Sequence, residues 1–249
     1  MFINLAVLYL ECDKQKYNRS LPVLQAYLEK LKFCNKTLIV IDNSNEEKEI
    51  EKISKNYYRL GGDNSIREFS GWQKGLDFLN SSNFNYDIIL FVNDSFLCYD
   101  GSFLKKANIL TVIKALINNS VIGQIDYHNE KVELLGYDTT EWIRTNCFFV
   151  PKKIIKDINN VYTVDNEKLN EFIDEDYCGR YFKEDAPLSN NLKEIIVKWL
   201  TQEWHSKFKI EDNWQLFRNK TGAMFNESLL SARIKEKGYK IQNFYRVRG

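Results

Sequence analysis

The chain has 249 residues, of which 44% are hydrophobic and 14% aromatic, and its formal net charge is +1. This length and apolar content suffice for one large domain with its own core. The small net charge excludes the strongly basic field that nucleic-acid-binding proteins usually carry, so we expect no nucleic-acid partner. No apolar run approaches the roughly 20 residues of a membrane-spanning helix, and residues 1–10 lack the basic start of a signal peptide. We therefore expect a cytoplasmic protein.

Residue types that bind metals or act as nucleophiles are sparse. The five cysteines are widely spaced, and no two of them form a Cys-x-x-Cys pair. A disulfide framework or a zinc site is therefore not expected. The chain has two histidines, which excludes a histidine-rich metal site and leaves little room for Ser-His-Asp chemistry.

Strands and helices are predicted to alternate through the first 120 residues. Residues 2–10 are nearly all apolar and predict a buried strand, and the β-branched residues 37–41 predict a second, short strand. A third strand is predicted at residues 57–60. Ser20 is expected to cap a helix whose apolar residues recur at helical spacing as far as Leu31. The charged run at residues 46–55 alternates in sign, which is typical of the solvated face of a helix.

The stretch at residues 87–95 reads Asp-Ile-Ile-Leu-Phe-Val-Asn-Asp-Ser and predicts a central strand of the sheet. Its five consecutive apolar residues are too few for an independent helix, and they suit a strand that is buried on both faces. Three polar residues follow directly: Asn93, Asp94 and Ser95. Because ligands of open α/β sheets bind beyond the carboxyl ends of the strands, Asp94 is well placed to hold a metal ion or a metal-bound phosphate. The alternative is an Asx turn that only ends the strand.

A second informative stretch runs from Asp63 to Leu79. Its large apolar residues recur at helical spacing and predict the buried side of a helix: Phe69, Trp72, Leu76 and Leu79. The small residues between them would let a neighbouring element or a ligand approach closely. Asn64 and Arg67 lie at the junction of loop and helix, where backbone amides and a cation can meet an anion. The alternative is a packed helix with a surface arginine.

The second half of the chain shows a different pattern. A helix is expected at residues 109–117. Alternating segments predict strands, with an antiparallel arrangement, at residues 121–127, 132–135 and 143–150. A helical insertion rich in aromatic residues is expected at residues 151–225. A helix that opens at Asn226 and ends at Gly238 precedes a last strand at residues 239–244.

These patterns together predict an α/β fold, with a mainly parallel sheet flanked by helices and a helical insertion in the C-terminal half. No internal repeat, low-complexity tract or flexible linker divides the chain. Residues 1–249 are therefore expected to form a single domain.

Four short segments carry a resemblance through their order and spacing: residues 38–44 (Leu-Ile-Val-Ile-Asp-Asn-Ser), 61–64 (Gly-Gly-Asp-Asn), 91–95 (Phe-Val-Asn-Asp-Ser) and 225–238 (Phe-Asn-Glu-Ser-Leu-Leu-Ser-Ala-Arg-Ile-Lys-Glu-Lys-Gly). Together they resemble the GT-A (Rossmann-like) nucleotide-sugar glycosyltransferases, especially the family-2 group and relatives that build bacterial surface polysaccharides. The first two resemble the strand whose Asp meets the nucleobase and the stretch that lines the nucleotide. The third takes the place of the Asp-x-Asp motif.

The resemblance implies roles for individual residues. In the family's C-terminal motif the second acid, six residues before an arginine, is the catalytic base, and Glu227 takes that place while Asn226 replaces the first acid. The alternative is that Glu227 is a first-turn acid favoured by the helix dipole. The residues implied to bind the donor are Asp42, Asn43, Asn64, Arg67, Asn93, Asp94 and Ser95. The residues implied to bind the acceptor are Trp142, Asn146 and Trp204.

A cofactor and partners are implied as well. A Mn²⁺ or Mg²⁺ ion is expected at Asp94, with its other ligands supplied by phosphates and water. Residues 1–120 would bind the nucleotide sugar, and residues 121–249 would bind the acceptor, a glycan or lipid-linked glycan of the O-antigen, lipopolysaccharide or capsule type. The basic residues near the C-terminal end, including residues 246–249, would contact the inner face of the cell membrane peripherally.

The implied function is hexosyl transfer from a nucleotide-diphosphate donor to a glycan hydroxyl group, with inversion if Glu227 is the base. One alternative is a sugar-phosphate nucleotidyltransferase. It is disfavoured because Leu-Glu-Cys-Asp, at residues 10–13, stands where a Gly-rich basic loop would follow the first strand. The other alternative is a nucleotide-sugar or glycan-binding module without turnover, in keeping with the reduced Asn-Asp-Ser and Asn-Glu motifs.

Overall fold

The computed structural model describes residues 2–44, 49–100, 104, 106–204 and 209–244, with the backbone alone at residues 99, 100, 203 and 204. The strands are β1 (Ile3–Glu11), β2 (Cys34–Asp42), β3 (Glu51–Ser54), β4 (Tyr57–Gly61), β5 (Ile88–Asn93), β6 (Ser120–Leu134), β7 (Tyr137–Pro151) and β8 (Lys240–Asn243). The helices are α1 (Ser20–Lys30), α2 (Glu68–Ser81), α3 (Phe96–Asp100), α5 (Ile109–Ile117), α6 (Lys152–Ile158), α7 (Asn166–Leu169), α8 (Asn190–Lys198) and α9 (Trp214–Glu236). A π-helical turn, η1 (Trp199–Trp204), and a 3₁₀ turn, η2 (Glu211–Asn213), lie between α8 and α9.

The strands form one eight-stranded sheet in the order β3-β4-β2-β1-β5-β7-β6-β8. β1 is parallel to both β2 and β5, and β2 is parallel to β4. β3 and β7 run antiparallel to their neighbours, whereas β6 and β8 are parallel to each other. The predicted α/β class with a mainly parallel sheet is thus confirmed. Because β2 lies on one side of β1 and β5 on the other, the carboxyl ends of β1 and β5 form the switch point where open α/β sheets bind ligands.

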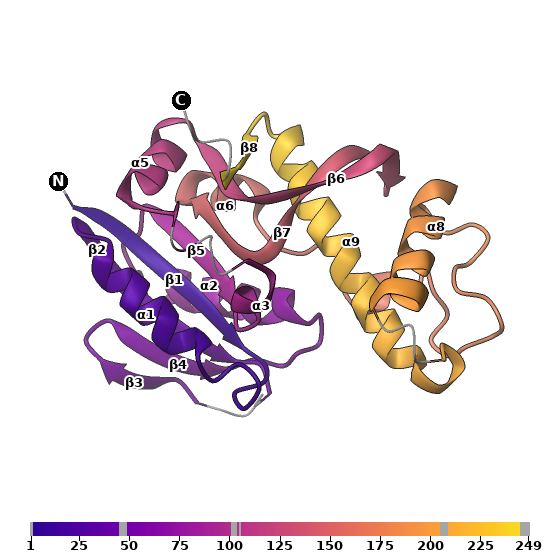
Figure 1. Ribbon diagram of the computed structural model, residues 1–249, viewed down its shortest axis with the longest axis horizontal. Coiled ribbons are helices and arrows are strands. Elements are labelled where there is room, and N and C mark those ends of the chain that lie inside the picture. The colour runs from indigo at the N-terminus through magenta and orange to yellow at the C-terminus, as the bar shows by residue number, and fades with distance from the viewer. Residues whose placement is uncertain (1, 45–48, 101–103, 105, 205–208, 245–249) are drawn as a thin grey trace.

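Helices cover both faces of this sheet (Figure 1). On one face α2, α6 and the C-terminal part of α9 form a core in which Trp72 packs edge-on against Phe91 and Phe148. On the other face α1 and α5 pack against the alternate residues of the same strands. The strands β1 and β5 are therefore buried on both faces, as their continuous apolar runs predict.

The close packing of α2 on the sheet depends on small residues. Its predicted apolar stripe is confirmed by four side chains that are at most 1% exposed: Phe69, Trp72, Leu76 and Leu79. A Cβ atom at Gly71 would lie 2.2 Å from Cδ1 of Leu10, and one at Gly75 would lie 3.0 Å from Cδ2 of Leu8. The small residues therefore bring the helix against β1.

The long helix α9 joins the sheet to a helical lobe (Figure 1). Its N-terminal part packs with α7, α8 and the tip of β6 in a separate apolar cluster that includes the fully buried Phe217. Its C-terminal part packs on the sheet through Leu230 and Ile234. The prediction of a helix that opens at Asn226 is wrong, because α9 begins at Trp214 and continues through the Asn-Lys-Thr-Gly segment at residues 219–222, where packing in the lobe buries Thr221 fully.

The insertion predicted at residues 151–225 is helical only in part. It holds α6, α7, α8 and the first half of α9, and irregular segments join them at residues 159–165 and 170–189. The irregular chain is held by side chains of α9. Asn226 is fully buried, and its amide group accepts hydrogen bonds from the backbone of Thr163 and Val164 and donates one to Val164. Asn226 thus has a structural role in fastening this segment.

Three local predictions need correction. The run at residues 46–55 is not a helix in its described part, because β3 is an exposed edge strand paired with β4, a place where charged side chains prevent further pairing. The three strands predicted between residues 121 and 150 are two longer antiparallel strands, β6 and β7, joined at Gly136. Ser20 does not cap α1: it is the first helical residue, and its hydroxyl group donates to the backbone carbonyl of Asp94 at 2.5 Å.

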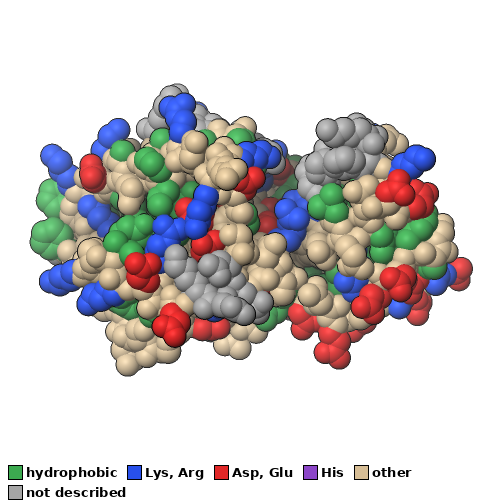
Figure 2. Space-filling model, turned by 90° about the horizontal axis from the view of Figure 1, so that it is seen from below, with side chains coloured by type: hydrophobic (Ala, Val, Ile, Leu, Met, Phe, Trp, Pro, Cys, Tyr) green, Lys and Arg blue, Asp and Glu red, His purple; other side chains and the backbone are tan. Residues whose placement is uncertain are grey.

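Side chains of both charges are interspersed on the surface, and acidic ones gather on the helical lobe (Figure 2). Within the described ranges, no helix has the length and apolar character needed to cross a membrane. Residues 246–249, which are predicted to contact a membrane surface, lie outside the described residues.

Replacing Gly71 with Ala is expected to destabilise the fold by about 1–3 kcal/mol, because the added methyl group overlaps Leu10 in the packed layer. A Gly-to-Ala change inside a helix ordinarily stabilises it by about 0.5–1 kcal/mol, so the sign itself is diagnostic. Gly222→Ala in α9 is the matched control, since its Cβ would meet the flexible end of Leu169 at 3.3 Å. Chemical denaturation measures both variants. Equal stability of the two proteins would contradict this packing.

Candidate functional site

A cleft of about 640 Å³ lies where the carboxyl ends of β1 and β5 meet the β6–β7 hairpin and the helices α8 and α9. Its walls include many residues that the sequence predicts for the site: Arg67, Asn93, Asp94, Ser95, Trp142, Asn146 and Glu227. These residues are distant in the sequence, and the fold brings them to one cavity. The cleft coincides with the switch point of the sheet, the expected place for a ligand.

Asp94 fastens the end of β5 to the loop that follows β1. It is 3% exposed, and its Oδ2 atom accepts hydrogen bonds from the backbone amides of Cys12 at 2.6 Å and Asp13 at 2.8 Å. Burial raises the pKa of Asp94, and these two hydrogen bonds oppose the shift. The bonds connect two strands rather than closing a local turn, so the side chain does more than end β5.

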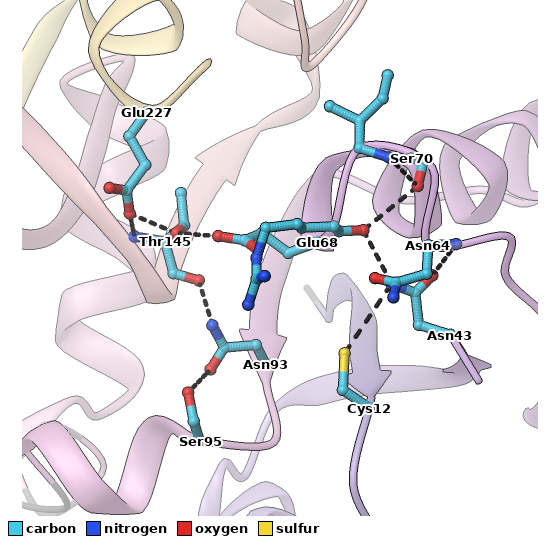
Figure 3. A network of polar contacts seen from close by, with 11 residues as sticks. Cys12, Asn43, Asn64, Glu68, Ser70, Asn93, Ser95, Thr145 and Glu227 are labelled. Atoms are coloured by element: carbon cyan, nitrogen blue, oxygen red, sulfur yellow. Dashed lines mark hydrogen bonds and ion pairs between the residues drawn. The ribbon is translucent and has the colours of Figure 1, made fainter. Parts of the chain in front are cut away.

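Asn93 and Ser95 order the same edge of the sheet. The side-chain amide of Asn93 donates to the backbone carbonyl of Thr145 at 3.2 Å, and the Ser95 hydroxyl group donates to Oδ1 of Asn93 at 2.9 Å. Figure 3 shows this chain of contacts from β5 to β7. Asn93 therefore couples the central strand to the hairpin at the mouth of the cleft.

The predicted metal ion can be judged by the protein oxygen atoms that are available to bind it at Asp94. Two amides occupy Oδ2, which leaves Oδ1 as the available carboxylate oxygen. Across the described ranges, no three His, Cys, Asp or Glu side chains group closely enough to hold a metal ion. One protein oxygen does not fit a cation resident in the free protein. The Mn²⁺ or Mg²⁺ ion thus stays a prediction that requires a bound diphosphate to complete its ligands.

Asp42, which the resemblance places at the nucleobase, does not line the cleft. It is 2% exposed, and its carboxylate accepts hydrogen bonds from the ammonium group of Lys14 at 2.5 Å and the hydroxyl group of Ser44 at 2.8 Å. Both oxygens of Asp42 are thereby engaged within the protein. A nucleobase would have to displace Lys14, which is half exposed, to reach this carboxylate.

Asn43 holds the loop that leads into α2. It is 3% exposed, and its Nδ2 atom donates to Oδ1 of Asn64 and to the backbone carbonyl of Arg67, both at 2.8 Å. Asn64 and Arg67 both have positive backbone φ angles, 52° and 53°. Residues other than glycine rarely adopt such angles. Asn43 therefore stabilises a strained loop that presents Arg67 to the cleft, while Asn64 lies in a second, smaller cleft beside it.

Glu227, in the middle of α9, is fixed by Thr145 of β7. Its Oε1 atom accepts hydrogen bonds from the Thr145 amide at 3.0 Å and from the Thr145 hydroxyl group at 2.5 Å. The same hydroxyl oxygen lies 3.1 Å from Oε1 of Glu68, the first residue of α2 (Figure 3). Because α9 begins at Trp214, the interpretation of Glu227 as a first-turn acid is wrong.

The environment of Glu227 favours its protonated form. Burial raises the pKa of Glu227 and the charge of Glu68 raises it further, while Lys220 and the hydrogen bonds from Thr145 lower it. A carboxylate whose pKa is raised toward neutral pH is a more effective general base once it is ionised. Glu227 lines the cleft, so its chemistry faces the cavity.

The β6–β7 hairpin supplies an aromatic and polar wall. The ring of Trp142 lies against that of His128, with centroids 4.3 Å apart, and Arg144 pairs with Asp126. All of these residues line the cleft. Burial lowers the pKa of His128, which keeps the ring neutral. An aromatic face beside a few hydrogen-bonding groups is typical of a small-molecule site.

The remaining predicted acceptor residues differ in what the structure describes. Asn146 lines the cleft, is 9% exposed, and its Oδ1 atom accepts a hydrogen bond from the Cys147 amide at 2.9 Å. Trp204 ends η1, and its side chain lies outside the described part of the chain. Another part of the cleft wall is apolar, formed by Leu192, Ile195, Ile196, Trp199 and Met224.

Several cleft residues escaped the sequence analysis: Glu68, Thr145, His128 and Arg144. Glu68 has the pattern of an ordinary first-turn acid, and Thr145 that of an ordinary strand residue. One usable signal was alternation, because residues 142, 144 and 146 share a face of β7. With Trp142 and Asn146 assigned to the site, that spacing places Arg144 beside them.

Neither the family models nor the curated proteins searched contain a match to this chain. The resemblance to GT-A glycosyltransferases therefore stays a prediction. What the structure adds to it is that two of the four segments, at residues 91–95 and 225–238, line one cleft.

Asp94→Ala is expected to destabilise the fold by about 1–3 kcal/mol, because it leaves the amides of Cys12 and Asp13 without their acceptor. Asp94→Asn retains an oxygen at that position and is expected to lose less. Thermal or chemical unfolding without any ligand compares the two variants. If Asp94→Ala were as stable as the wild type, the carboxylate would have no role in fastening the loop.

Proposed function

We propose that this cleft transfers a sugar from a nucleotide-diphosphate donor to a hydroxyl group of a bacterial surface glycan, on a GT-A architecture. The observation that carries the proposal is that Glu227 and the polar end of β5 line one cavity at the switch point of the sheet. Such a transferase needs a site for a diphosphate and a base for the acceptor within reach of the same anomeric carbon. The α/β sheet with helices on both faces supports this architecture.

The donor side would consist of Arg67, Asn93 and Ser95. Arg67 forms an ion pair with Glu68 at 3.8 Å, and its buried Nε atom has no hydrogen-bond partner in the described residues. A guanidinium group suits the oxygens of a diphosphate. Negative charge grows on the diphosphate as the glycosidic bond breaks, so a fixed cation stabilises the leaving group. A divalent ion, when bound at Asp94, would supply further positive charge for the same purpose.

Glu227 would act as the base on the acceptor side. The acceptor hydroxyl group gives its proton to the Glu227 carboxylate while its oxygen bonds to the anomeric carbon of the donor. The bond from that carbon to the diphosphate oxygen breaks, and the diphosphate leaves with the electron pair. Attack from the side opposite the leaving group inverts the anomeric centre. Thr145 keeps Oε1 of Glu227 fixed, so Oε2 is the oxygen that would accept the proton.

The acceptor under this proposal is a glycan or a lipid-linked glycan. Trp142 would pack on a sugar ring, with Asn146 beside it as a hydrogen-bonding group. The apolar wall of α8 and η1 suits a less polar part of the acceptor, and Ile195 is 36% exposed there. A lipid-linked acceptor would bring the protein to the inner face of the cell membrane.

A second candidate function is a nucleotide-sugar or glycan-binding module without turnover. It is favoured by Asp94, whose Oδ2 atom is occupied by backbone amides. A module of this kind would be stabilised by a donor and would release no nucleotide. A transferase releases nucleotide, slowly by hydrolysis and faster with an acceptor.

Glu227→Gln is expected to lower the rate of sugar transfer by roughly 10²–10⁴-fold, because it removes the base and retains the shape of the side chain. Nucleotide release from a panel of nucleotide sugars, with glycan acceptors present, measures the rate. Donor binding, followed by thermal shift, should persist in this variant. Glu141→Gln is the matched control, since Glu141 pairs with Lys235 and does not line the cleft.

The pH dependence gives the same test an independent readout. The wild-type rate should fall as the pH drops through the pKa of Glu227, which burial holds above its ordinary value, because only the ionised carboxylate accepts a proton.

Stabilisation by a donor without nucleotide release would favour the binding module. No stabilisation by any donor would contradict both candidate functions.

A further inference from the structure

Two carboxyl groups meet at one hydroxyl group in the cleft. The oxygen of the Thr145 hydroxyl lies 2.5 Å from Oε1 of Glu227 and 3.1 Å from Oε1 of Glu68 (Figure 3). A threonine hydroxyl has a single proton to donate. If both carboxyl groups are ionised, one of these two contacts therefore joins acceptor to acceptor and is repulsive.

The charged side chains around this pair do not supply the hydrogen bond that the second contact lacks. Glu68 has Arg67 as an ion-pair partner at 3.8 Å, which is too long for a hydrogen bond. Lys220, on the same helix as Glu227, contributes a positive charge near that carboxyl group. On the hairpin, the opposite charges of Arg144 and Asp126 pair with each other. Neither arginine donates to the Thr145 oxygen in the described part of the chain, and Lys220 acts on Glu227 through its charge.

One added proton satisfies the whole chain of contacts. One carboxyl group then donates its proton to the Thr145 oxygen, and the Thr145 hydroxyl group donates to the other carboxylate. Either carboxyl group can be the one that carries the proton, so the proton belongs to the pair rather than to one residue. In a partly buried site a fully satisfied chain is strongly favoured over one with a repulsive contact.

We propose that Glu68 and Glu227 hold one proton between them through the Thr145 hydroxyl group, and that Glu68 is the positioning residue that sets when Glu227 becomes a base. The pair loses its two protons in separate steps. The second leaves at higher pH, because its loss puts two negative charges in one site. In the transfer reaction proposed above, this raises the proton affinity of Glu227, which makes it a stronger general base once it is ionised. That consequence rests on the proposed function, whereas the pairing does not.

An NMR titration of the free protein with ¹³C-labelled glutamate carboxyl groups tests the pairing directly. The two resonances are assigned by their loss in Glu68→Gln and Glu227→Gln. In the wild type both resonances should show the same two midpoints, separated by more than about one pH unit. A single midpoint for each resonance, unrelated to the other, would overturn the proposal.

Two variants test the charge of Glu68 and the hydroxyl group of Thr145 separately. Glu68→Gln keeps the size of the side chain and should lower the Glu227 midpoint by about one pH unit or more, since it removes the neighbouring charge. Thr145→Val keeps the backbone donor and removes the hydroxyl donor, so the Glu227 midpoint should rise. Glu141→Gln, outside the cleft, should leave it unchanged.

An unchanged Glu227 midpoint in Glu68→Gln would overturn the proposal, and an unchanged midpoint in Thr145→Val would remove the hydroxyl group from it. No substrate enters this titration. A protein that shows the shared titration and transfers no sugar would keep the pair and refute the transferase. A protein that transfers sugar while its two carboxyl groups titrate independently would support the transferase and refute the pair.

Discussion

The two hydrogen bonds from the backbone amides of Cys12 and Asp13 to the Asp94 carboxylate are the constraint on which the cleft depends. They join the loop after β1 to the end of β5, the two central strands whose carboxyl ends form the switch point. The Ser20 hydroxyl group adds a bond from α1 to the carbonyl of Asp94. Loops at the ends of parallel strands are mobile unless something ties them. Here a buried acid does so, and the base of the cleft is fixed before any ligand arrives.

Thr145 has the corresponding place on β7, the strand next to β5. Its carbonyl accepts from Asn93, and its amide and hydroxyl groups donate to Glu227, so β5, β7 and α9 meet at one residue. The same residue brings the N-terminus of α2 into contact through Glu68. A side chain that orders Glu227 and joins it to a second carboxyl group links the geometry of the site to its proton chemistry.

Features that depend on a local pattern could be predicted, and features that depend on distant packing could not. The apolar run of β5 suits only a buried strand, and the helical spacing of apolar residues in α2 suits only a helix. The structure confirms both. The charged run at residues 46–55 suits a solvated helix and a solvated edge strand equally, and pairing with β4 decided the outcome. In the site, motifs led to Glu227 and the end of β5. Glu68 joins them only because α2 and α9 converge on Thr145.

The central claim, that a nucleotide diphosphate binds at this switch point, is tested most directly by calorimetric titration of nucleoside diphosphates into the wild type and Arg67→Met. Arg67 lines the cleft, and the loss of a charge-assisted contact to a diphosphate should weaken binding roughly tenfold or more. Arg180→Met is the matched control, because Arg180 pairs with Asp174 on the helical lobe and should not affect affinity. Equal affinity of Arg67→Met and the wild type, or no binding by the wild type, would contradict the account.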